Sequence, residues 1–143
     1  MQRFSLSFFA LLLLTTAVVA DRPAYFGFGF TYHPPLPNAK DRRGWMTVRI
    51  TAPGSPAERA GLKPGDLITA IAGQPLTFKT DLDVLQRLAA FRPSERLKLT
   101  ILRDRKTRQV QVIGVPMSDR QYDQWKANMD LARDSTGIRR PPG

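Results

Sequence analysis

The stretch GSPAERAGLKPGDLITAIAGQPL, residues 54–76, requires the chain to turn sharply twice within a few residues. Ser55 is suited to cap a helix, Pro56 to occupy its first position, and Glu58 to hydrogen-bond back to the Ser55 amide. Gly61 follows closely, and a residue that ends a helix often needs a positive φ. The sequence therefore predicts a capped helix little more than one turn long.

The second turn lies in KPGD, where Pro64 and Gly65 fit the two central positions of a type II turn. LITAIA, residues 67–72, follows as a short strand that is apolar on both faces, so we expect it to be buried. The short helix, the turn and this strand are expected to close one end of a small barrel.

The neighbouring segments predict further short strands and one long helix. Apolar and polar residues alternate in residues 45–50, 96–101 and 109–112, the pattern of half-buried strands, whereas residues 80–91 have leucines at helical spacing after a capping Thr80. The predicted fold class is α+β: a small, partly open β-barrel or sandwich of short strands with one long and one short helix, plus a C-terminal helix. The core is expected to include Val48, Ile50, Leu67, Ile68, Ile71, Leu99 and Ile101.

This arrangement resembles PDZ domains, in particular the bacterial type found in periplasmic proteases of the high-temperature-requirement family. The resemblance extends from about Tyr25 to Val115 and rests on GWMTVRITAPGSPAERAGL, on the helix after QPLTFKTDL and on the hairpin RLKLTILRDRKTRQVQVIGV. It implies the fold of that family and a peptide-binding function. The sequence departs from the family at Ala72, where Asn usually precedes the hairpin glycine. Because Ala tolerates positive φ less well than Asn, we expect that turn to differ.

The resemblance also implies that PAYFGFGFTY, residues 23–32, contains the ligand site. Glycines allow several N–H groups to converge on one anion, which suits the terminal carboxylate of a peptide. The expected carboxylate-binding loop is Tyr25, Phe26, Gly27, Phe28 and Gly29, and the expected groove strand is Phe30, Thr31 and Tyr32. The amide donors are either residues 26–28, which we favour, or residues 28–30. Read without the resemblance, the stretch also fits an aromatic strand with a bulge. We expect Gly27→Val to weaken binding without unfolding the domain.

The bound peptide is expected to lie between this strand and the helix of residues 80–91, by adding to a free strand edge. One stripe of the helix is expected to face the groove: Leu82, Leu85 and Ala89. The other apolar residues of the helix are then expected to face the core: Val84, Leu88 and Phe91. The alternative is that all six side chains belong to the core.

The two ends of the chain lie outside the resemblance. One Arg followed by an apolar run predicts a secretory signal peptide over residues 1–20, or else an uncut N-terminal membrane anchor. Residues 21–117 are expected to form the PDZ-like domain. Residues 118–134 predict an amphipathic helix that packs on the domain or docks a partner, and residues 135–143 predict a disordered basic tail. We therefore expect a periplasmic or secreted protein, or one anchored to the inner membrane if the first segment is retained.

The sequence offers no set of residues suited to catalysis or to metal binding. It has no cysteine and one histidine, His33, which we expect to be exposed, so the usual zinc and nucleophile sets cannot be assembled. We expect no enzyme activity and no cofactor. The expected function is a stand-alone module that binds C-terminal or extended segments of cell-envelope proteins, not nucleic acid. The net charge of +10 leaves an alternative, a basic adaptor for an anionic surface of lipid headgroups or polysaccharide.

Overall fold

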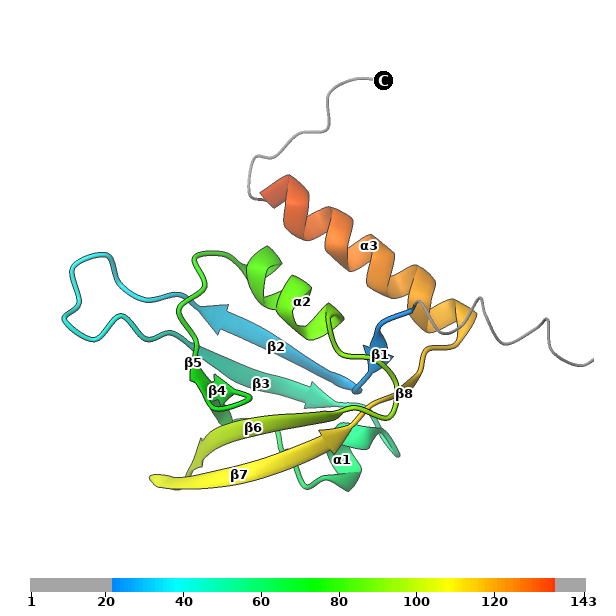
Figure 1. Cartoon of the computed structure of the whole chain (residues 1–143), viewed down its shortest axis with the longest axis horizontal. Coiled ribbons are helices and arrows are strands. Elements are labelled where there is room, and N and C mark those ends of the chain that lie inside the picture. Colours follow the sequence, from blue (N-terminus) through cyan, green and yellow to red (C-terminus); the bar gives the residue numbers. More distant parts are fainter. Residues whose placement is uncertain (1–21, 136–143) are drawn as a thin grey trace, which may run out of the picture.

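The computed structural model describes residues 22–135, so the expected signal peptide and residues 136–143 of the expected tail lie outside the described part (Figure 1). An antiparallel sheet contains β2 (Phe28–His33), β3 (Trp45–Thr51), β4 (Leu67–Ile71), β6 (Arg96–Arg103) and β7 (Lys106–Ile113), in that spatial order. The short β5 (Gln74–Pro75) pairs with β4, and β1 (Ala24–Tyr25) pairs with β8 (Val115–Pro116). The helices are α1 (Pro56–Arg59), α2 (Asp81–Ala89) and α3 (Asp119–Ser135). The predicted α+β fold is confirmed.

The helices lie on different sides of the curled sheet. Figure 1 shows α2 beside β2, with α3 lying beyond α2, whereas α1 lies at the other side near β7. Strand β2 ends the sheet, because it pairs with β3 along one edge and with no other strand of the described chain. Within residues 22–135, no helix has the length and apolarity that a bilayer crossing requires.

The local signals of the opening stretch produce the expected structures. Ser55 caps α1 by accepting a hydrogen bond from the Glu58 N–H at 3.3 Å, and Gly61 and Gly65 have φ values of 88° and 92°. One detail was predicted wrongly. The Glu58 carboxylate accepts from the Gly54 N–H at 3.2 Å instead of from Ser55, because the Ser55 N–H donates to the Ala52 carbonyl at 3.1 Å.

The core lies between the sheet, α1 and α2. Its largest fully buried side chains are Met46, Val48, Leu62, Ile68, Ile71, Leu76, Val84, Leu97, Leu99, Ile101 and Val112. Two expected core residues differ. Leu67 is only half-buried, and Ile50 is 62% exposed. The pairing of β2 with β3 shifts between Gly29 and Phe30, so Arg49 is an extra residue on β3 and Ile50 moves to the other face.

The turn between β4 and β5 also differs from the expectation. Ala72 and Gly73 both adopt positive φ, at 50° and 76°, between the paired residues Ile71 and Gln74. These are the two central positions of a hairpin turn that favours Asn-Gly. The turn that was expected to differ therefore keeps this left-handed geometry, and Ala72 adopts a conformation that is unfavourable for alanine.

A buried ion pair joins the opening stretch to β6. Asp66 is 2% exposed, and its carboxylate accepts hydrogen bonds from Arg103 Nε at 2.7 Å and Nη2 at 2.6 Å, and from the Lys63 N–H at 2.8 Å. Arg103 also donates to the Gly61 carbonyl at 2.7 Å. Burial raises the pKa of Asp66, but these hydrogen bonds and positive charges outweigh it, so the pKa lies below its ordinary value.

Candidate functional site

The loop between β1 and β2 has its carbonyl groups fixed by α1 and the residues before it. The Phe26 carbonyl accepts from the Ala57 N–H at 2.9 Å, and the Gly27 carbonyl accepts from the Ala52 N–H at 2.8 Å. A trans peptide unit directs its N–H opposite to its C=O. The N–H groups of Gly27 and Phe28 therefore point away from these partners, toward the open side of the loop.

Gly27 is packed too closely for any side chain. Its φ is 84°, its carbonyl also accepts from Ser55 Oγ at 3.3 Å, and a Cβ added to it would lie 2.2 Å from the Ser55 Cβ. The expectation that Gly27→Val leaves the fold intact is therefore wrong. The clash involves the residue that caps α1, so the substitution would disturb the helix as well as the loop.

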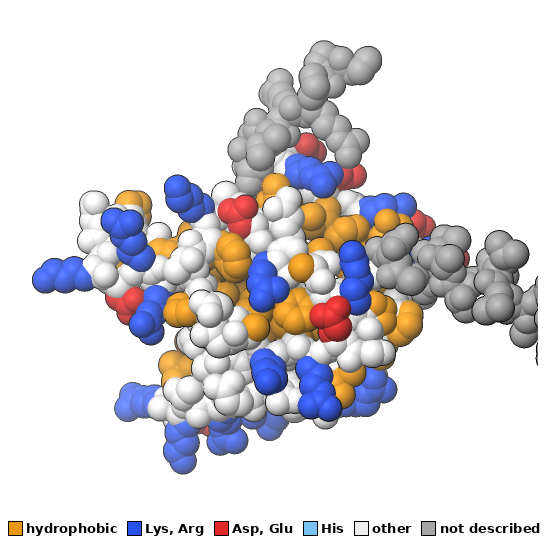
Figure 2. Space-filling model, viewed as in Figure 1, with side chains coloured by type: hydrophobic (Ala, Val, Ile, Leu, Met, Phe, Trp, Pro, Cys, Tyr) orange, Lys and Arg blue, Asp and Glu red, His pale blue; other side chains and the backbone are white. Residues whose placement is uncertain are grey.

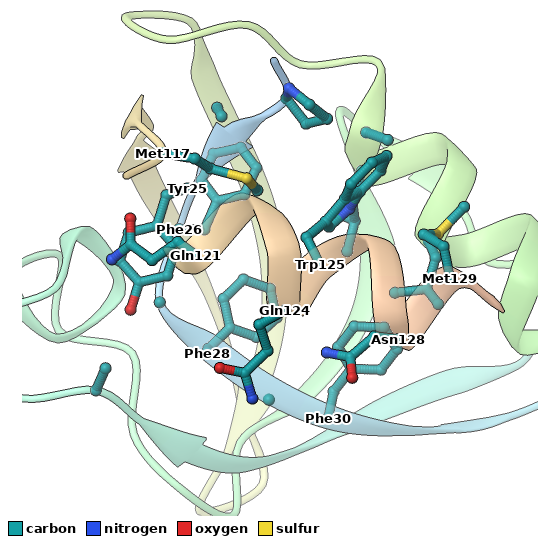
Figure 3. Close-up of a pocket in the computed structure, with 18 of the residues that line it drawn as sticks. Tyr25, Phe26, Phe28, Phe30, Met117, Gln121, Gln124, Trp125, Asn128 and Met129 are labelled. Carbon is teal, nitrogen blue, oxygen red and sulfur yellow. The ribbon is translucent and has the colours of Figure 1, made fainter. Parts of the chain in front are cut away.

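A cavity of about 350 Å³ lies beside this loop (Figure 3). Its walls come from three parts of the chain. The loop and β2 contribute Tyr25, Phe26, Gly27, Phe28, Gly29 and Phe30. Helix α2 contributes Leu85, Leu88 and Ala89, and α3 contributes Gln121, Gln124, Trp125, Asn128 and Met129. The remaining lining residues are Pro23, Ala24, Ile50, Ala52 and Met117. The outer edge of β2 borders the cavity, so an extended segment has both free backbone groups and an apolar hollow beside it.

The structure brings most of the expected site residues of the loop and β2 together. All five expected loop residues and Phe30 line the cavity, whereas Thr31 and Tyr32 do not. Thr31 is exposed and accepts from Arg49 Nε at 2.9 Å. Tyr32 is buried, and its hydroxyl donates to the Phe78 carbonyl. Burial, with a smaller effect of two nearby aspartates, raises the pKa of Tyr32.

Helix α2 is divided between three surroundings. Leu85 and Ala89 line the cavity, but Leu82 is 6% exposed and packs against α3. The placement of Leu82 therefore differs from the expected groove stripe. Val84 and Phe91 belong to the core, as expected, and Leu88 is half-buried between the core and the cavity.

Helix α3 forms a wall of the cavity, which the sequence did not indicate. Met129 and Ala132 are buried against Leu82, so of the two expected placements the helix adopts packing on the domain. A capping box precedes the helix: the Ser118 N–H donates to Gln121 Oε1 at 2.9 Å, and the Gln121 N–H donates to Ser118 Oγ at 3.2 Å. The apolar stripe of α3 predicted that the helix packs, but no local signal could indicate which surface it covers.

The first turn of α3 is fastened to the start of the domain. Arg22 forms an ion pair with Asp119 at 2.7 Å, and its guanidinium lies over the ring of Tyr122, 4.7 Å from the centroid. Tyr122 in turn stacks on Trp125, with ring centroids 5.7 Å apart. Arg22 is thus engaged with α3.

His33 is not simply exposed as expected. It is half-buried and stacks on Trp45, with ring centroids 4.9 Å apart, and its Nε2 lies 3.3 Å from Thr47 Oγ1. Among residues 22–135, no three His, Cys, Asp or Glu side chains are grouped so that they could hold a metal ion.

Basic side chains gather at another place, around the β6–β7 hairpin. Figure 2 shows Lys and Arg side chains concentrated on the lower part of the molecule, where Figure 1 places these two strands. Arg105, Lys106 and Arg108 are exposed there. This basic surface is separate from the cavity.

Comparisons with known proteins find similarity to PDZ domains and to periplasmic proteases. Residues 51–103 match the family model described as PDZ domain. Over 80 residues the chain is 42% identical to "Probable periplasmic serine endoprotease DegP-like" of Rhizobium meliloti. The matched region covers 55% of this chain and 15% of that protein. Over 75 residues it is 40% identical to the periplasmic pH-dependent serine endoprotease DegQ of Escherichia coli, with 52% and 16% covered.

A solved structure, the HtrA-type protease AlgW with a decapeptide, superimposes with a TM-score of 0.54 at 20% identity, covering 68% of this chain and 30% of that one. This likeness concerns the fold. The chain spans about 15% of the length of the two curated relatives, and the part that it matches is their PDZ region.

Proposed function

The chain contains a PDZ domain of the kind found in periplasmic HtrA-type proteases, and from this premise we propose that it is an exported peptide-binding module. It would bind C-terminal or extended segments of cell-envelope proteins by strand addition to β2. We propose a periplasmic or secreted location because these relatives are periplasmic proteases and because residues 1–20 are expected to be a signal peptide. A proteolytic activity forms no part of this proposal, because the similarity reaches only the PDZ part of those relatives.

One observation supports the proposal most directly: an unpaired strand edge, an apolar cavity and two outward N–H groups meet at one place. An extended peptide can pair with the free edge of β2 while a terminal apolar side chain enters the cavity. The terminal carboxylate can then accept hydrogen bonds at the loop. The Phe26 and Gly27 carbonyls accept hydrogen bonds from the Ala57 and Ala52 N–H groups, so the N–H groups of Gly27 and Phe28 point the opposite way. We therefore favour residues 26–28 as the donors.

Titration with pairs of peptides that differ only at the C-terminus tests this function. We expect micromolar binding, about −8 kcal/mol, of peptides that end in a free carboxylate and a large apolar residue. Amidation of the same peptides removes the charge and should weaken binding at least ten-fold. Equal affinity for the free and amidated forms would refute the carboxylate site and leave strand addition by internal segments.

A second candidate function, binding to an anionic envelope surface, is favoured by the basic hairpin. Arg105, Lys106 and Arg108 project from it, and none of them forms an ion pair with another described residue. Salt separates the two candidates, because the screening length falls to about 3 Å at 1 M salt. Binding to anionic vesicles should then disappear, whereas binding of an apolar peptide in the cavity should persist.

A further inference from the structure

Two side-chain amides on α3 face the place where a peptide would lie. Gln124 and Asn128 line the mouth of the cavity, and both are exposed. Figure 3 shows Gln124 on the side of Phe28 and Asn128 on the side of Phe30, in the order in which β2 runs. Within the described chain, neither amide forms a hydrogen bond, whereas Gln121 is already used in the cap of α3. Each free amide offers both donors and an acceptor.

A peptide that adds to β2 has two edges. Alternate residues direct their N–H and C=O toward β2, and the residues between them direct these groups to the other side. Buried among apolar side chains, these outward groups would cost free energy unless they found partners. The outward residues recur every two positions, about 6.8 Å along an extended chain.

The spacing of the two amides matches this repeat. Gln124 and Asn128 are four residues apart on one helix face, a rise of about 6 Å. Resting on the proposed strand addition, we propose that Gln124 and Asn128 bind the outer backbone edge of the peptide, so that it is held between β2 and α3. The preferred ligand is then an extended segment with free N–H groups at its outward positions, which excludes proline there.

The packing of α3 indicates that this helix borders the cavity and does not occupy the place of the peptide. Its apolar residues Met129 and Ala132 are directed to Leu82 of α2, and its first turn is tied down by Arg22. Of the α3 side chains that line the cavity, Trp125 and Met129 are apolar and pack in one cluster with Leu82 and Leu85, whereas Gln121, Gln124 and Asn128 are polar. A helix that occupied the peptide's place would instead direct its apolar side chains against β2.

The test uses the full chain and a free-carboxylate peptide that binds it. Gln124→Ala and Asn128→Ala are each expected to weaken binding about five-fold, the effect of one hydrogen bond, and together about 25-fold. Gln111→Ala, an exposed amide on β7 away from the cavity, is the matched control and should change nothing. Ala132→Asp should release α3 from Leu82 and also weaken binding; circular dichroism verifies that the domain remains folded. Tighter binding after Ala132→Asp would show that α3 obstructs the groove and would overturn the proposal.

N-methylated peptides separate this inference from the function on which it rests. Methylation of an inward N–H should abolish strand addition in every variant. Methylation of an outward N–H should weaken binding to the native chain about five-fold. It should reduce the affinity much less when both Gln124 and Asn128 are replaced by Ala. If inward methylation matters but outward methylation costs the same in both chains, strand addition stands and the role of α3 is refuted. If inward methylation has no effect, strand addition fails and the inference fails with it.

Discussion

Replacing Gly27 by Ala should destabilise the domain through two separable effects. The first is the backbone: at φ 84° an L-residue with a side chain costs about 1–2 kcal/mol more than glycine. The second is steric, because the new Cβ would lie 2.2 Å from the Ser55 Cβ, where carbon atoms prefer about 3.5–4.0 Å. Ser55 is buried and caps α1, so it cannot move away without a shift of the backbone.

Forced overpacking of this kind costs about 1–3 kcal/mol, which gives a total of about 2–5 kcal/mol for Gly27→Ala. Gly61→Ala is the matched control. Gly61 has nearly the same φ, 88°, but an added Cβ there meets nothing within 4 Å among the described residues. Its replacement should therefore cost only the backbone contribution.

Equilibrium unfolding in urea, followed by circular dichroism, measures both losses. A third variant isolates the clash: Ser55→Gly removes the opposing Cβ, and glycine at this capping position costs only a few tenths of a kcal/mol. The native chain should lose more unfolding free energy on Gly27→Ala than on Gly61→Ala. In the Ser55→Gly background, this difference should fall by at least half. If Gly27→Ala costs no more than Gly61→Ala, or if Ser55→Gly gives no relief, the close packing of the loop on α1 is not what limits this position.

Two further predictions concern stability. Arg103→Ala leaves the buried Asp66 without its charged partner and should cost about 3 kcal/mol at neutral pH. Because the folded pKa of Asp66 is lowered, this contribution is present above the ordinary value of about 3.9 and is lost as the pH falls through the folded pKa. Urea unfolding should therefore show the two chains converging in acid, and a constant difference would contradict the ion pair. Ala72→Asn should raise stability by about 0.5–1 kcal/mol, seen as a higher melting temperature, because Asn suits the positive φ; a lower one would contradict the turn geometry.

The features that the sequence predicted well depend on a few neighbouring residues. The cap at Ser55 and the positive φ of Gly61 and Gly65 are local consequences of residue type, so α1 and the turn after it could be read directly. The expected carboxylate-binding loop was chosen from the resemblance; its residues do line one cavity, and their role in binding a carboxylate stays a prediction.

The features that were missed depend on residues far apart in the chain. Ile50 continues the alternation of β3, but a bulge formed against β2 turns it outward, and a single strand contains no sign of its partner's register. Leu82 has the pattern of a groove residue, yet an apolar stripe looks the same whether a ligand or α3 covers it. The contribution of α3 to the cavity required the packing of two helices that are 30 residues apart in the chain, between Ala89 and Asp119.

The pairing of β1 with β8 has a mechanical consequence. Ala24 lies opposite Pro116 and Tyr25 opposite Val115, so the chain enters and leaves the PDZ fold at adjacent points. Force applied to the chain at these two points acts first on the short pairing between β1 and β8, and the long pairing between β6 and β7 does not bear it directly. Strand β1 also adjoins the loop at Gly27, where the end of a bound peptide would lie. Tension along the chain and occupancy of the site would therefore act on the same few residues, and a bound peptide would resist the first step of forced unfolding.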